Sequence, residues 1–214
     1  MKLLVVGSGG REHAVIRKLK ENKEIEKIYC APGNGGISAD AECVDIKATD
    51  KENMVKFAKE NAIDFCVVTP DDPLALGMVD EMEEAGIPCF GPKANAAIIE
   101  ASKAFSKDLM KKYGIPTADY ETFDNEKDAL HYIEEKNTFP IVIKADGLAA
   151  GKGVVIVENK EDAISTLKDM MVDGALDGAG SKVVLEEFLT GFECSLLCFT
   201  DGKTIVPMVS AKDH

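Results

Sequence analysis

Residues 3–16, "LLVVGSGGREHAVI", join a short apolar run to a glycine cluster and then to helix-forming residues. This order is typical of a strand, loop and helix that bind a nucleotide or another phosphate. Short β-rich runs continue to alternate with helical patterns over residues 1–90, which indicates a parallel α/β sheet. The expected strands are 2–6, 27–31, 42–46, 63–69 and 88–90, and the expected helices are 12–21, 51–61 and 73–85.

The composition, 45% hydrophobic and 29% charged over 214 residues, is that of an ordinary soluble globular protein. A net charge of -13 argues against a nucleic acid or an anionic membrane as partner. There is neither an apolar stretch of membrane-spanning length nor a signal-peptide core, so we expect a cytoplasmic protein. The six cysteines show no metal-like pairing, and we expect buried free thiols.

The pattern changes after Gly114-Ile115-Pro116, which punctuates the chain like a boundary. One or two helices are expected over 92–113, before this point. After it, β-rich blocks are separated by two amphipathic helices, which predicts an antiparallel α+β unit. The expected helices are 126–137 and 161–173, the expected strands are 141–144, 153–157, 183–189, 192–200 and 203–209, and Thr190-Gly191 and Asp201-Gly202 are expected hairpin turns.

The first glycine loop does not satisfy the dinucleotide fingerprint G-x-G-x-x-G. Gly7 and Gly9 occupy the first two positions, but Glu12 stands at the third, where a bulky acid would hinder close helix–strand packing. The second strand ends in Cys30-Ala31-Pro32, without a carboxylate for a ribose. NAD binding is therefore disfavoured.

A glycine turn at a helix N-terminus still suits a phosphate, and Arg11 is one of only two arginines among 25 basic residues. The alternative is a surface arginine beside a turn that only the fold requires. Loops 32–36 and 69–73 should lie at the same sheet edge. Asp71 and Asp72 could bind sugar hydroxyls there, or they could cap a helix. A sugar phosphate would fit a site in which Arg11 binds the phosphate and the two acids bind the sugar hydroxyls.

A second glycine loop lies in "FPIVIKADGLAAGKGVVIV", residues 139–157. It lacks the G-x-x-x-x-G-K-[ST] pattern, but a glycine hairpin with lysines could close over a triphosphate. Lys144 stands inside the apolar strand that precedes it. Because burying an unpaired ammonium is costly, an anionic ligand would be its partner.

Two adjacent acids, Glu186 and Glu187, interrupt the apolar run in "VVLEEFLTGFECS", residues 183–195. In a strand they point to opposite faces, so one of them should face the apolar side. Adenine and ribose would supply hydrogen-bond donors for that acid. An exposed edge strand would explain both acids equally well.

Taken together, these segments resemble the ATP-grasp superfamily, and in particular the glycinamide ribonucleotide synthetase (phosphoribosylamine–glycine ligase) family. The GREH loop and KADGLAAGKG are highly specific in combination. The matching segments are GSGGREH (7–13), PGNG (32–35), FGP (90–92), SKAF (102–105), KADGLAAGKG (144–153), EEFL (186–189) and DH (213–214).

The resemblance implies a Rossmann-like parallel-sheet N-terminal (pre-ATP-grasp) domain, 1–101, followed by an incomplete α+β ATP-grasp domain. Residues 102–122 and 190–214 would form part of the ATP-grasp core, and 123–189 its lid subdomain. The implied reaction, in de novo purine biosynthesis, joins glycine to 5-phosphoribosylamine through a glycyl phosphate formed from ATP. The products would be glycinamide ribonucleotide, ADP and phosphate.

The family also implies site residues at the matching positions, with ATP and Mg²⁺ as cofactors. No residue is expected to act as a covalent catalyst, because no nucleophilic triad is visible. Gly9, Gly10, Arg11, Glu12, Asn34 and Gly35 would bind the sugar phosphate, Asp213 would lie near the glycine amine, and Lys103, Lys144, Gly151, Lys152, Gly153, Glu186, Glu187, Phe188, Leu189 and Glu193 would bind ATP. Asp71 is added as a substrate-binding candidate because of its place in the loop after the fourth expected strand.

Asp71-Asp72 and Lys212 depart from the family, which usually has glutamate–alanine and glutamine there. The chain resembles the N-terminal half of the enzyme, so we expect the magnesium ligands beyond residue 214 and no ligase activity from this chain alone. Two alternatives stay open. One is another ATP-grasp carboxylate–amine ligase, and the other is a non-catalytic nucleotide-binding module.

Overall fold

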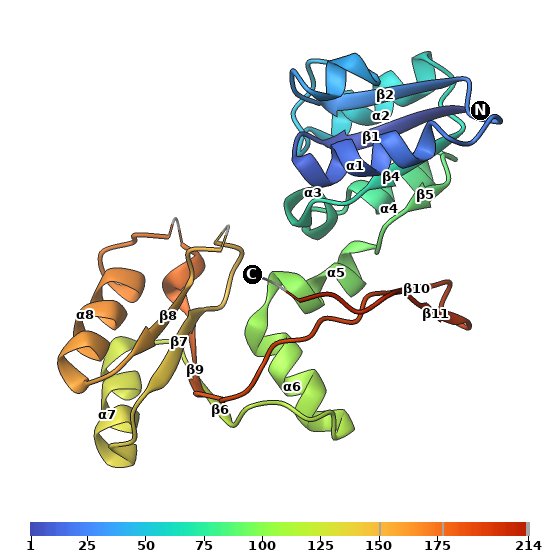
Figure 1. The fold of residues 1–214 in the computed structure, drawn as a ribbon. Helices are drawn as coiled ribbons and strands as arrows, with labels where there is room; N and C mark the ends of the chain where they lie inside the picture. Colours follow the sequence, from blue (N-terminus) through green and yellow to red (C-terminus); the bar gives the residue numbers. More distant parts are fainter. Residues whose placement is uncertain (150, 177, 213–214) are drawn as a thin grey trace.

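The computed structural model describes residues 1–149, 151–176 and 178–212. A parallel sheet with its helices forms one end of the molecule, and an antiparallel sheet with two helices forms the other (Figure 1). Two consecutive helices, α5 (Ala94–Ala101) and α6 (Lys103–Tyr113), connect them. Gly114 ends α6 in the left-handed conformation, at φ 64°.

The first sheet has five parallel strands in the order β3-β2-β1-β4-β5. The chain moves outward from β1 to β3 and then returns to the other side of β1 with β4. The connections before β3 therefore cover one face of the sheet, and those after it cover the other. The strands are β1 (Lys2–Gly7), β2 (Lys27–Pro32), β3 (Glu42–Cys43), β4 (Phe65–Val68) and β5 (Cys89–Phe90), and the helices are α1 (Gly10–Leu19), η1 (Ile37–Ala39), α2 (Lys51–Glu60), α3 (Asp71–Ala75) and α4 (Met78–Glu84).

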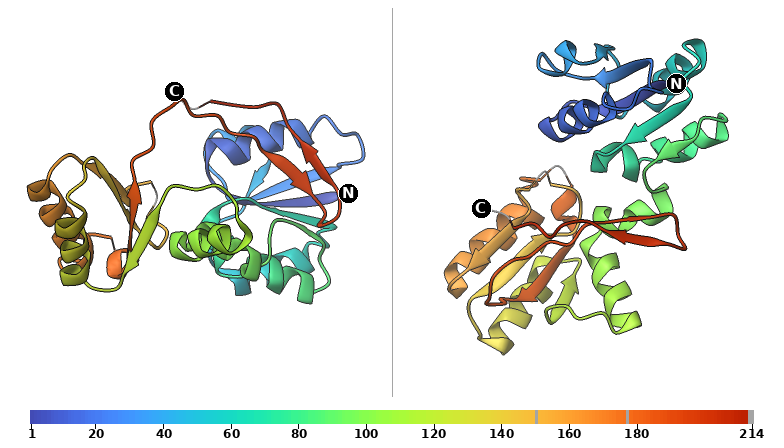
Figure 2. Two further views of the ribbon diagram at one scale, coloured as in Figure 1. Left: turned by 90° about the horizontal axis from the view of Figure 1, so that it is seen from below. Right: turned by 45° about the vertical axis from the view of Figure 1, so that its right-hand side comes forward.

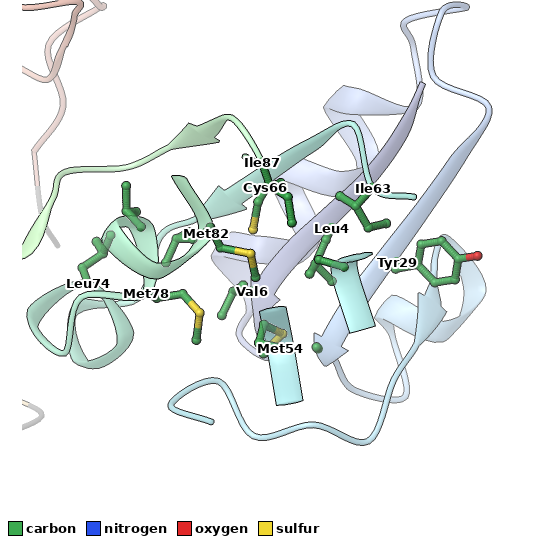
Figure 3. Packing of buried hydrophobic residues seen from close by; sticks show 14 of the residues in the cluster. Leu4, Val6, Tyr29, Met54, Ile63, Cys66, Leu74, Met78, Met82 and Ile87 are labelled. Carbon is green, nitrogen blue, oxygen red and sulfur yellow. The ribbon is translucent and has the colours of Figure 1, made fainter. Parts of the chain in front are cut away.

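Alternating residues of β1 supply the two cores of this sheet. Leu3 and Val5 pack with Ile16 of α1 on one face. Leu4 and Val6 face the other way, where they pack with the buried methionines of α2 and α4 (Figure 3). Because both faces are covered, the strands are apolar throughout, as expected for a parallel sheet. The methionines are Met54, Met78 and Met82.

The second sheet has four antiparallel strands in the order β6-β9-β7-β8. Helices α7 and α8 cover one face, where Ile143 and Leu185 pack on Ile133 and Leu167. The opposite face is directed toward α6 (Figure 1). The elements are β6 (Tyr120–Phe123), α7 (Glu126–Lys136), β7 (Ile141–Ala145), β8 (Val154–Val157), α8 (Lys160–Met171), η2 (Ala179–Ser181) and β9 (Val183–Glu187).

Beyond β9 the chain is exposed and forms a short hairpin of β10 (Cys198–Thr200) and β11 (Ile205–Pro207). The hairpin extends back toward the parallel sheet, where Phe199 lies 5.9 Å from Phe90 of β5, centroid to centroid (Figure 2). The turn predicted at Asp201-Gly202 is confirmed, since the Asp201 carboxylate accepts hydrogen bonds from the next turn residues.

Three sequence predictions about elements were wrong. Thr190-Gly191 is no hairpin turn, because both edges of β9 are already paired with β6 and β7. Most of the strand expected over 192–200 is therefore unpaired, and only its last three residues form β10. The single helix expected over 73–85 is divided into α3 and α4 at Gly77, whose φ is 83°. Strand β6 was missed altogether.

The six cysteines are all free, but the expectation that they are buried holds only in part. Cys30 and Cys66 are buried, whereas Cys194 and Cys198 lie exposed around the C-terminal hairpin. Burial raises the pKa of the Cys30 thiol to about 12. Within the described residues, no helix is both long enough and apolar enough to cross a membrane.

Candidate functional site

A cavity of about 970 Å³ lies at the carboxyl edge of the parallel sheet, where the loops after the adjacent strands β1 and β4 meet. This is the point at which the strand order reverses, the usual ligand position in open α/β sheets. The far wall of the cavity comes from the β7–β8 loop and from the segment after α8. The lining residues are Gly9, Gly10, Arg11, Glu12, Val15, Thr69, Pro70, Asp71, Asp72, Leu148, Ala149, Lys152, Ala175 and Leu176.

Glu12 organises the first glycine loop from inside. Its side chain is buried, and the backbone N–H of Gly9 donates to its Oε2 at 2.6 Å. The hydroxyl of Thr69 donates to Oε1 at 2.8 Å, which connects the β1 loop to the β4 loop. Glu12 occupies the position of the third glycine in the dinucleotide pattern, but it has a structural role of its own. It caps α1 and connects the loops after β1 and β4.

Gly7 has to be glycine for this arrangement to exist. Its φ of 134° is in a region that side chains rarely adopt, and a Cβ would lie 2.6 Å from Cγ of Glu12 and 3.0 Å from Cγ of Pro70. The sharp exit of the chain from β1 and the close approach of Glu12 therefore depend on the same residue.

Asn34 connects the second loop of the parallel sheet to the first. Its Nδ2 donates to the carbonyl of Ser8 at 2.7 Å, while its Oδ1 accepts from the N–H groups of Gly36 and Ile37. Gly35 lies exposed in the same loop. Neither Asn34 nor Gly35 lines the cavity itself, so Asn34 acts on the first loop through the Ser8 carbonyl.

A charged cluster supports the outer side of α1. His13 Nε2 lies 2.8 Å from Oδ2 of Asp40, and Lys20 Nζ lies 2.7 Å from Oδ1 of the same residue. Lys20, followed by His13, lowers the pKa of the Asp40 carboxyl to about 2. Asp40 therefore connects α1 to the segment that follows η1.

Arg11, Asp71 and Asp72 present charged side chains to the cavity. Arg11 is exposed in the first turn of α1. Asp71 and Asp72 lie in the first turn of α3, whose N-cap is Pro70, and no side-chain capping hydrogen bond is found there in the described residues. The capping alternative for these two acids is thus unsupported, whereas both residues line the cavity.

Asp146 fixes the second glycine loop at the end that follows β7. The Asp146 carboxylate accepts from the hydroxyl of Ser102 at 3.0 Å and from the N–H of Ala104 at 2.7 Å, at the start of α6. Lys103 extends from the same helix turn, and its Nζ donates to the carbonyl of Gly147 at 3.1 Å. The start of α6 and the β7–β8 loop are thereby held together.

Two lysines share one carboxylate oxygen between α6 and the antiparallel sheet. Lys144 Nζ of β7 and Lys107 Nζ of α6 each lie 2.9 Å from Oε2 of Glu186 in β9. Side-chain exposure is 6% for Glu186, 8% for Lys107 and 27% for Lys144. The sequence argument expected an anionic ligand to be the partner of Lys144, but the protein itself supplies one.

The sheet face that carries this cluster is apolar and exposed along β8. Val154 and Ile156 of β8 lie directly opposite Lys144 and Val142 of β7 and are 47% and 51% exposed. Oε1 of Glu186 is buried on this face without a hydrogen-bond partner among the described residues. An apolar surface beside two ammonium groups and a free acceptor can receive a flat, hydrogen-bonding ring that carries a negative tail.

Other predicted ATP-site residues lie apart from this cluster. Glu187 is exposed, as the alternation of the strand predicts, and Glu193 lies in the exposed segment before β10. Phe188 and Leu189, 37% and 62% exposed, follow β9 at the edge of the sheet. Gly151, with φ 80°, and Gly153 belong to the β7–β8 loop, and Asp213 lies outside the described residues.

Sequence reasoning missed three residues that organise these sites, Thr69, Lys107 and Asp146. A polar residue at the end of β4 and an acid beside a helix start are weak but readable signals for Thr69 and Asp146. Lys107 lies four residues after Lys103 and therefore on the same helical face. In the sequence it is one of several lysines in an amphipathic helix, so nothing marked it as buried.

Comparisons with known proteins match the region of the parallel sheet and the region of the antiparallel sheet separately. Residues 1–100 match the family model described as phosphoribosylglycinamide synthetase, N domain, and residues 101–214 match the one described as phosphoribosylglycinamide synthetase, ATP-grasp (A) domain. The fold is thus a parallel α/β sheet followed by an α+β region of the ATP-grasp class, which confirms the predicted fold class. The chain belongs to the phosphoribosylglycinamide synthetase family.

Named relatives give the extent of the match. Phosphoribosylamine–glycine ligases of Clostridium acetobutylicum and Listeria innocua are 52% and 53% identical over 100% of this chain and 51% of their own length. The crystal structure of a phosphoribosylamine–glycine ligase from Thermotoga maritima aligns with a TM-score of 0.81 and 31% identity, over 98% of this chain and 49% of that one. The chain spans about half the length of the curated relatives it matches.

Proposed function

We propose that this chain contributes the sugar-phosphate and ATP sites of an ATP-dependent ligase that joins glycine to 5-phosphoribosylamine. The observation that carries the proposal is the single cavity lined by both glycine loops, with Arg11 on one side and Lys152 on the other. Such a cavity brings two phosphate-binding elements to one place. The names of the relatives supply the substrates.

The first loop suits the phosphate of phosphoribosylamine. Gly9, Gly10 and Arg11 surround the N-terminus of α1, where free N–H groups and the helix dipole favour an anion. A guanidinium can bind such a phosphate with two parallel hydrogen bonds. Asp71 and Asp72 across the cavity would accept hydrogen bonds from the sugar hydroxyls.

The antiparallel sheet suits ATP. The apolar surface of Val154 and Ile156 would receive adenine, and Oε1 of Glu186 would accept a hydrogen bond from it or from the ribose. Lys103 and Lys144, together with the 151–153 loop, would bind the phosphates. The adenine ring would lie beside the segment Glu187, Phe188 and Leu189, whose backbone would contact the edge of the ring. Glu193 would lie near the ribose.

The proposed chemistry needs positioning and charge neutralisation more than a nucleophilic side chain. ATP would phosphorylate the carboxylate of glycine, and the amine of the bound sugar would attack the acyl phosphate. Lysines and the arginine would stabilise the phosphate charges. Within the described residues no group of three His, Cys, Asp or Glu side chains is arranged to hold a metal ion, so no step is assigned to Mg²⁺ here.

The proposal also divides the chain by task. Residues 1–101 would bind the sugar phosphate, 123–189 would form the lid subdomain over ATP, and 102–122 with 190–214 would contribute to the core between them. Small molecules are the proposed partners. Six free cysteines fit a reducing compartment such as the cytoplasm.

The two arginines of the chain give a direct test. Arg11→Ala is expected to weaken binding of ribose 5-phosphate at least tenfold, because a charge-assisted phosphate contact is lost, and to change ADP affinity less than twofold. Isothermal titration calorimetry measures both affinities. Arg17→Ala, on the same helix but away from the cavity, is the matched control and should change neither. Equal losses for both ligands, or none, would contradict the proposal.

A further inference from the structure

Lys107 is a buried lysine whose ammonium group is fully occupied by the protein. It donates to the hydroxyl of Thr117 at 2.7 Å and to the carbonyl of Ala118 at 3.5 Å, and it forms the ion pair with Glu186 at 2.9 Å. Three acceptors match the three N–H groups of an ammonium. Lys107 therefore has no N–H group left for a ligand.

Lys144 is in the opposite situation. Among the described residues its ammonium group donates to Oε2 of Glu186, and its side chain is 27% exposed. It is the lysine of the pair that a ligand can reach. A one-to-one ion pair with Glu186 would nevertheless neutralise it, which is a poor arrangement for binding a phosphate.

The second ammonium resolves this conflict. Two lysines and one carboxylate give the cluster a net charge of +1, and in the described residues Glu186 is the carboxylate paired with each lysine. Tyr120, opposite Glu186 in β6, adds no negative charge at neutral pH, because a tyrosine hydroxyl ordinarily ionises only near pH 10. Burial, followed by its hydrogen bond to Asp108, raises its pKa further, to about 12. The excess positive charge is thus available at Lys144.

We propose that Lys107 is a positioning residue that neutralises Glu186 and so leaves the charge of Lys144 free for a nucleotide phosphate. Glu186 can then fix the place of Lys144 without cancelling its attraction for an anion. Burial strengthens the effect, because charges interact more strongly where water is excluded. This inference rests on the proposed ATP site, since the anion it explains is the phosphate chain of that nucleotide.

The test is a charge-balance experiment with four variants: Lys107→Met, Lys107→Arg, Glu186→Gln and the double variant K107M/E186Q. Lys107→Met is expected to weaken ADP binding about tenfold while leaving adenosine binding within twofold. Lys107→Arg, which keeps the charge, should stay within threefold for ADP. The double variant removes one charge of each sign, so it should bind ADP at least threefold more tightly than Lys107→Met. Glu186→Gln measures separately what altering the acceptor proposed for adenine costs, and that cost is subtracted when the double variant is compared with the unaltered protein.

A purely structural role for Lys107 predicts different results. ADP and adenosine affinity would then fall together, and the double variant would not recover ADP binding; either result overturns the inference. Thermal unfolding checks that each variant is folded. If Lys107→Met does not fold, Lys107→Gln replaces it, since the amide can still donate to Thr117.

A second readout separates this inference from the proposed function. Acylation of Lys144 by an amine-reactive ester, followed by peptide mass spectrometry, needs no nucleotide. It should slow at least threefold in Lys107→Met, where Lys144 becomes the sole counterion of Glu186, and recover in the double variant. Failure of the unaltered protein to bind ADP would refute the proposed ATP site, whereas unchanged acylation in Lys107→Met would refute the role of Lys107.

Discussion

The two glycine-rich loops line one cavity from opposite sides, yet the protein holds them in different ways. The first loop is organised along its whole length, by the buried Glu12 from below and by Asn34 from the side. The second is held at its ends, where Asp146 contacts α6 and the N–H of Ala145 donates to the carbonyl of Gly153 at 2.8 Å.

One glycine from each loop, Gly7 and Gly151, illustrates this difference. A Cβ on Gly7 would meet Glu12 and Pro70, whereas a Cβ on Gly151 would meet no atom within 4 Å. A preformed turn of N–H groups suits a monophosphate of fixed shape, because little has to be ordered on binding. The open space around Gly151 lets the tip of the second loop adjust to the longer phosphate chain proposed for ATP.

Alanine substitutions at Gly7 and Gly151 should give the largest contrast between the loops. Gly7→Ala is expected to lower the free energy of unfolding by about 3 kcal/mol, because backbone strain at φ 134° adds to a clash with Glu12. Gly151→Ala is expected to cost only about 1 kcal/mol, since its φ of 80° is strained but the space is open. Urea unfolding monitored by circular dichroism measures both values. Equal costs would show that the first loop is no more constrained than the second.

Asn34 offers a smaller change that is confined to the first loop. Asn34→Ala removes three hydrogen bonds to backbone groups and is expected to cost about 1–2 kcal/mol of unfolding free energy. It should also weaken ribose 5-phosphate binding several-fold while leaving ADP binding unchanged. Calorimetry and urea unfolding check the two effects.

Asn22→Ala is the matched control for this variant. The Asn22 side chain accepts one hydrogen bond, from the N–H of Glu24, in an exposed turn away from the cavity. Its replacement is expected to change stability by no more than about 0.5 kcal/mol. A loss of ADP affinity in Asn34→Ala would show that the two loops are not independent.

The smallest expected effect is a dependence on acid pH at the outer side of α1. Because Lys20 and His13 lower the pKa of Asp40 to about 2, its ionised form stabilises the folded state above the unfolded pKa of about 4. That contribution is lost as the pH falls from about 4 through about 2. The difference in urea midpoint between the unaltered protein and Asp40→Asn should therefore shrink over this range. A constant difference would mean that the Asp40 charge does not contribute.

Much of the fold followed from local patterns. The five parallel strands were placed correctly because most of them are short β-rich runs separated by helical patterns, and Gly114 ends α6 as predicted. The segment after β9 was misplaced because "VVLEEFL" and "FECSLLCFT" have equal β propensity. Only the pairing of β9 with both β6 and β7 prevents the second run from forming a hairpin with β9, and its last three residues pair with β11 instead.

Prediction from local sequence pattern was more limited for the site than for the fold. The sequence by itself determined that two glycine loops follow strands, that Arg11 stands in one of them and that Lys144 ends the strand before the other, because these are properties of adjacent residues. Only the tertiary structure decided that both loops face one cavity and that Lys107 and Glu186 meet Lys144. Residues 107, 144 and 186 lie on three elements far apart in sequence. The burial of these side chains and their mutual ion pairs hold them together in the folded chain. Neither can be deduced from the residues next to each of them in the sequence.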